Sequence, residues 1–167
     1  MFRWTQEPGY PLLVLEQVDG HLKSHQQRFY SNPNEPEQPS AWQIPLAIVT
    51  PSGVSQVLYT NETSAEFDKM IESLLLSERW VKVNQNTLCL VHYTEDMLQR
   101  LGKAVQSREL QSLDRIQLLL DLKRLCNAQR VKPGDVLQFL QFYANEDDWS
   151  VLEIVASVLS NVFSLSS

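Results

Sequence analysis

The chain has 167 residues, of which 43% are hydrophobic and 20% are charged, so it can form a packed core and is not intrinsically disordered. Its 14 basic and 20 acidic residues give a formal net charge of −6. This charge argues against a nucleic-acid partner, because binding to phosphate backbones depends on clustered Lys and Arg.

Compartment and membrane signals are weak in this sequence. Two cysteines, Cys89 and Cys126, are too few for a disulfide framework and suit a reducing compartment at least as well as an oxidising one. The first residues lack the apolar core of a signal peptide. The longest apolar stretch, Val151 to Phe163, is interrupted by polar residues and is too short to cross a bilayer. We expect no membrane segment, and the cytoplasm is slightly favoured as the location over the secretory or membrane-anchored route.

The first part of the chain, residues 10–94, has the pattern of short strands separated by turns. In one of them, Trp42, Ile44 and Leu46 alternate with less apolar residues, which is the period of a strand with one buried face. The segment 64–77 fits a strand or a helix. The expected strands cover residues 12–15, 21–30, 42–48 and 54–60, followed by a hairpin-like pair at 80–84 and 88–93. This series predicts a small β-sandwich.

From Thr94 onward the apolar period changes to that of a helix. Thr94 and Ser112 are expected to cap the first and second helices, and Pro133 is expected to open the third. Asp147-Asp148 precedes a fourth helix that carries Trp149 to Phe163. Four helices with short connections predict antiparallel helices, either a bundle or the start of an α-solenoid-like domain. The fold class is therefore mixed, β then α.

The last two helices are unusually apolar. In the fourth, the apolar positions cover an arc of about 220°, whereas a surface helix usually needs a stripe of about 100°. Helices of this kind are normally covered on two sides, so we expect that covering elements are missing from the chain. This pattern predicts a fragment of a larger protein.

The histidines do not form a recognisable metal site. His21 and His25 have the spacing of two zinc ligands on a helix, but the general-base Glu of the zinc-peptidase motif is replaced by Leu22. In a strand, four residues separate two imidazoles by about 13 Å, which is too far for one ion. No phosphate loop, nucleophile elbow or catalytic triad is present. The sequence predicts no catalytic, cofactor-binding or metal-binding residue.

Arg115 is the most informative charged residue. It lies inside the apolar arc of the second helix, and a buried guanidinium needs a carboxylate or carbonyl partner. Two readings remain open: a site for an anionic ligand, or a structural ion pair between helices. We favour the ion pair because no accompanying cleft residues are visible.

Several segments, taken in order, resemble the C-terminal half of the zinc aminopeptidases related to puromycin-sensitive aminopeptidase, aminopeptidase N and the oxytocinase group. The junction between the catalytic and β-sandwich domains of that family resembles Trp4-Thr5-Gln6 and Gly9-Tyr10-Pro11-Leu12. Its sandwich strands resemble Gln27-Arg28-Phe29, Trp42-Gln43-Ile44-Pro45-Leu46, Trp80-Val81-Lys82-Val83-Asn84 and Val91-His92-Tyr93. Its first C-terminal helices resemble Asp114-Arg115 with Asp121, and Asn145-Glu146 with Trp149.

The match departs from the family at one place. Gln85 to Leu90 is shorter than the family pattern and lacks its Gly-aromatic-aromatic element, so the final hairpin is expected to be altered. Members of this family hold zinc with a His-Glu-x-x-His helix and a later Glu, and they bind the substrate's amino terminus with a Gly-x-Met-Glu-Asn strand. A Tyr assists at the transition state. None of these motifs occurs in residues 1–167, so no catalytic residue carries over.

The resemblance implies a domain arrangement and not a set of catalytic residues. It implies a β-sandwich domain at 1–94, with 1–9 as the tail of a catalytic domain, and the first helices of a C-terminal helical domain at 95–167. It also implies structural roles for Asp114, Arg115 and Asp121. The position of Met1 inside the matching region suggests a partial gene model, an internal start or a truncated form.

The expected function is that of a non-catalytic portion of a zinc-dependent aminopeptidase, which removes amino-terminal residues from peptides. This portion would support and cover the active site. Zinc, the peptide substrates, the catalytic domain and the later helices would belong to the parent enzyme. The alternative is a self-standing protein-interaction module with no enzymatic role, in which the wide apolar helices bind a partner.

Overall fold

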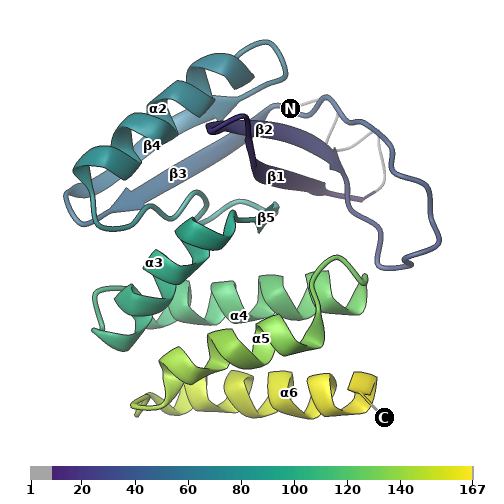
Figure 1. Ribbon diagram of the computed structural model, residues 1–167, viewed down its shortest axis with the longest axis vertical. Coiled ribbons are helices and arrows are strands. Elements are labelled where there is room, and N and C mark those ends of the chain that lie inside the picture. The colour runs from purple at the N-terminus through teal and green to yellow at the C-terminus, as the bar shows by residue number, and fades with distance from the viewer. Residues whose placement is uncertain (1–8, 167) are drawn as a thin grey trace. The chain divides into compact units, whose positions relative to one another are not determined.

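The computed structural model describes residues 9–166 (Figure 1). They form two compact units: residues 9–30 with 36–100 make unit 1, and residues 31–35 with 101–166 make unit 2. The predicted domain boundary after residue 94 remains a prediction. The segment Trp4-Thr5-Gln6, and almost all of the predicted catalytic-domain tail at 1–9, lie outside the described residues.

Unit 1 begins with a hairpin of two eight-residue strands, β1 (Pro11–Val18) and β2 (His21–Arg28), paired in antiparallel register from Pro11↔Arg28 to Val18↔His21. Asp19 and Gly20 connect the strands with φ values of 52° and 80°. Positive φ at both central positions is the geometry of a type I′ turn, whose twist matches that of the flanking strands. A third strand, β5 (Leu90–His92), pairs parallel to β1 and gives the order β2-β1-β5.

A second sheet consists of β3 (Ile44–Thr50) and β4 (Gly53–Tyr59), which form an antiparallel hairpin. Ile44 and Leu46 are fully buried on either side of the exposed Pro45, as the period of two predicts, but the second half of β3 is buried at every position from Leu46 to Val49. Trp42 and Tyr59 are also fully buried and complete this part of the core. The β-then-α fold class is confirmed.

The ambiguous segment 64–77 is a helix, α2 (Ser64–Ser77). Its buried residues, Phe67, Asp68 and Ile71, have the spacing of one helix face. The helix packs against β2, and the rings of Phe67 and Tyr59 meet edge to face at 5.0 Å.

The predicted hairpin between 80–84 and 88–93 is wrong. Lys82 exchanges two backbone hydrogen bonds of 2.8 Å with Val49 of β3, so the first half of the expected hairpin lies along the second sheet. The amide of Asn84 donates to the carbonyl oxygens of Thr87 (2.7 Å) and Cys89 (2.9 Å) and thereby closes the intervening loop. Because the loop is closed by a side chain, β5 is free to pair with β1 instead.

The remaining elements are helical: α3 (Glu95–Gln106), α4 (Ser112–Asn127), α5 (Pro133–Leu140), the 3-10 helix η1 (Gln141–Tyr143) and α6 (Trp149–Ser166). The predicted cap at Thr94 is confirmed, and Asp148 caps the fourth helix, which Asp147-Asp148 was expected to precede. The hydroxyl of Thr94 accepts a hydrogen bond from the N–H of Met97 at 3.2 Å, and Asp148 accepts one from the N–H of Ser150 at 2.9 Å. Pro133 opens α5 as expected.

The predicted capping role of Ser112 is wrong. Gln111 occupies the N-cap position of α4 without a side-chain hydrogen bond, and Ser112 is the first helical residue. The hydroxyl of Ser112 instead donates to Asp148 at 2.6 Å. A bond from a hydroxyl to a charged carboxylate is stronger than a bond between neutral groups, such as the one that a capping oxygen accepts from a backbone N–H.

In unit 2, α6 packs against α4 and α5, and in Figure 1 both lie on the same side of it. The helix is longer than the apolar stretch that the sequence suggested, with 18 residues and a mean hydropathy of 1.4. By length and composition it could cross a membrane, so the expectation that this segment is too short to do so was wrong. Only 17% of its residues are buried within the described chain.

Candidate functional site

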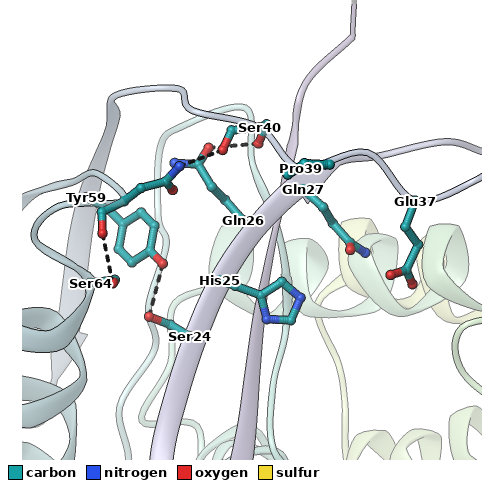
Figure 2. Close-up of a pocket in the computed structure, with 10 residues that line it drawn as sticks. Ser24, His25, Gln26, Gln27, Glu37, Pro39, Ser40, Tyr59 and Ser64 are labelled. Atoms are coloured by element: carbon teal, nitrogen blue, oxygen red, sulfur yellow. Dashed lines mark hydrogen bonds between the residues drawn. The ribbon is translucent and has the colours of Figure 1, made fainter.

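A polar pocket of about 460 Å³ opens beside β2 in unit 1 (Figure 2). It lies between this strand, the segment at 37–40 and the start of α2. In Figure 2 the hydrogen bond between Ser24 and Tyr59 lies on one side of the pocket and the side chain of Glu37 on the other. The lining residues are Ser24, His25, Gln26, Gln27, Glu37, Pro39, Ser40, Tyr59, Asn61 and Ser64.

Hydrogen bonds among these residues hold the upper wall of the pocket. The amide oxygen of Gln26 accepts from the hydroxyl of Ser40 (2.9 Å) and from the N–H of Trp42 (3.0 Å). The amide nitrogen of Asn61 donates to the carbonyl of Ser40 at 2.9 Å, and the hydroxyl of Ser64 donates to the carbonyl of Asn61 at 3.0 Å. These polar groups therefore join the segments that make the wall.

A second polar cluster lies at the other wall. The hydroxyl of Ser24 donates to the carboxylate of Asp68 and lies 3.1 Å from the hydroxyl of Tyr59. Burial raises the pKa of Tyr59, so its hydroxyl stays protonated at neutral pH. The cluster ties β2, β4 and α2 together. This cluster was not predicted from the sequence, because its three residues are far apart in the chain and no local motif marks them.

The pocket has no metal centre. Across residues 9–166, no group of three or more His, Cys, Asp or Glu side chains is placed to hold a metal ion. His21 and His25 are four residues apart on β2, and they contact different carboxylates, those of Glu72 at 3.4 Å and Glu16 at 3.5 Å. The described residues therefore do not fit a zinc site.

Unit 2 contains a buried ion pair between α4 and the segment before α6. The guanidinium of Arg115 donates from Nε and Nη2 to the two carboxylate oxygens of Glu146, at 2.9 Å and 3.0 Å. The side chains are 6% and 1% exposed. Two parallel charge-assisted bonds of this kind are the strongest pairing that a guanidinium makes with a carboxylate. The sequence marked Arg115 but did not identify its partner.

Further groups complete this network. Nη1 of Arg115 donates to the carbonyl of Leu110 at 2.6 Å, and the hydroxyl of Tyr143 donates to the carbonyl of Arg115 at 2.7 Å. Burial raises the pKa of Tyr143, so this hydroxyl remains a donor. Arg108 lies 3.6 Å from Glu146 and donates to Asp147 at 2.7 Å. With its positions filled by protein groups, the guanidinium of Arg115 has no open face for an anionic ligand.

The two aspartates grouped with Arg115 in the sequence are also buried. Asp114 is 3% exposed in the first turn of α4, where the helix dipole favours a carboxylate. Asp121 is 7% exposed, and its carboxylate lies 4.0 Å from Arg124 on the same helix. Their structural roles remain predictions.

The comparisons with known proteins agree with this organisation. Residues 80–167, more than half of the chain, match the model of the ERAP1-like C-terminal domain. The chain belongs to this family. The matching region begins before the last strand and includes α3 to α6, so it covers the whole network around Arg115.

Aligned relatives extend over nearly the whole chain. A puromycin-sensitive aminopeptidase from Caenorhabditis elegans is 34% identical over 160 residues, which is 90% of this chain and 17% of the relative. Aminopeptidase M1-A from Oryza sativa is 29% identical and covers 91% of the chain and 18% of the relative. An alanine/arginine aminopeptidase from Saccharomyces cerevisiae is 27% identical over 94% of the chain and 18% of the relative. The chain thus spans about a fifth or less of the length of these aminopeptidases.

Proposed function

We propose that this chain forms a non-catalytic portion of a zinc-dependent aminopeptidase that removes amino-terminal residues from peptides. The observation that carries the proposal is the family match at 80–167 together with 34% identity to an aminopeptidase over 160 residues. Within the parent enzyme, this portion would support and cover the active site. Its partners would be the catalytic domain and the remaining helices.

The described residues support a structural role. Polar side chains that could serve a site are instead engaged with protein groups. The amide oxygen of Gln26 accepts hydrogen bonds from Ser40 and Trp42, and Arg115 forms an ion pair with Glu146. Zinc chemistry would come from residues of the parent enzyme, because His21 and His25 contact different carboxylates and no group of three or more His, Cys, Asp or Glu side chains among residues 9–166 is placed to hold a metal ion. The domain boundary that we propose, after residue 94, separates the two sheets from the helices of the matching family.

The isolated chain is therefore expected to bind no stoichiometric zinc and to release no product from aminoacyl reporter substrates. Metal analysis of the purified chain and a fluorogenic aminopeptidase assay measure both properties. The nematode relative, assayed in parallel, is the positive control. Turnover by the isolated chain that a chelator abolishes would contradict the proposal.

A further inference from the structure

We draw no further inference here: the strongest candidate, the exposed apolar side of helix α6 around Trp149 and Phe163, carries none, because nothing among the described residues shows what covers it.

Discussion

At the scale of single residues, Arg115 shows how a buried charge is accommodated. Its two bonds to Glu146 and its bond to the carbonyl of Leu110 replace the water that the guanidinium loses on folding. A pair of this kind contributes little net stability compared with well-packed apolar residues. Removing one partner nevertheless costs much stability, because the charge of the other partner is then left buried and unpaired.

Arg115→Met should therefore destabilise unit 2. It keeps much of the side-chain volume but leaves the Glu146 carboxylate, 1% exposed, without its bidentate partner. The expected loss is about 3 kcal/mol, the lower end for a broken buried pair because Arg108 remains 3.6 Å from Glu146. Urea unfolding followed by circular dichroism measures it.

The matched control is Arg124→Met on the same helix, where the arginine side chain is 47% exposed and lies 4.0 Å from Asp121. An exposed pair of this kind contributes between about 0 and 1 kcal/mol. Equal unfolding midpoints for Arg115→Met and Arg124→Met would show that Arg115 is effectively solvated.

Gly102 in α3 provides a second residue-scale prediction. A Cβ added at this position would lie 2.2 Å from two carbons of the Phe142 ring. Helix propensity alone favours Ala over Gly by about 1 kcal/mol, but overpacking costs about 1–3 kcal/mol. Gly102→Ala should therefore lower the free energy of unfolding.

Gly134 in α5 is the control for this substitution, because nothing lies within 4 Å of a Cβ placed there. Gly134→Ala should be neutral or stabilising in the same urea experiment. If Gly102→Ala were also stabilising, the close approach of Phe142 to α3 would be incorrect.

At the scale of elements, local signals predicted the helices well and the pairing of strands poorly. Thr94, Pro133 and Asp148 mark helix starts because a cap or a fixed φ acts within a few residues. The position of β5 depends on Asn84 closing a loop and on β1 offering a free edge, and neither condition is local. The sequence therefore predicted the fold class but not the parallel pairing of β5 with β1.

In the candidate site, too, the features with a local signal were predictable and those that depend on distant residues were not. The position of Arg115 within an apolar arc was visible from the helical period, whereas Glu146 lies 31 residues later in an irregular segment. The polar pocket could not be predicted, because Ser24, Tyr59 and Asp68 come together only through the packing of α2 on β2.

The start of α6 should make the stability of unit 2 depend on pH. The hydroxyl of Ser112 and the backbone N–H of Ser150 donate to Asp148 and hold the pKa of its carboxyl below the usual value. A carboxyl with a lowered folded pKa stabilises the fold above its unfolded pKa of about 3.9. That stabilisation is lost as pH falls through the lower folded pKa.

Urea midpoints measured from neutral pH to pH 3 should therefore decrease at the acidic end for the wild type. Asp148→Asn removes the ionisable group while keeping a capping side chain, and Ser112→Ala removes the donor that lowers the pKa most. Both variants should show a shallower decrease. Parallel profiles for all three proteins would contradict this account of the helix start.

At the scale of the whole molecule, the chain combines two sheets, one covering helix and the first helices of the matched family domain. Its relatives are aminopeptidases more than five times as long as the aligned region. These observations support a structural contribution to a larger enzyme.

A chimeric enzyme tests this central claim most directly. The 160 residues of the nematode puromycin-sensitive aminopeptidase that align with this chain would be replaced by it. Zinc content and kcat/KM on an aminoacyl reporter would be compared with those of the intact enzyme and of a deletion lacking the region. We predict that the chimera binds zinc and keeps kcat/KM within about tenfold of the intact enzyme, a change of about 1.4 kcal/mol. A soluble, zinc-loaded chimera as inactive as the deletion would contradict the account.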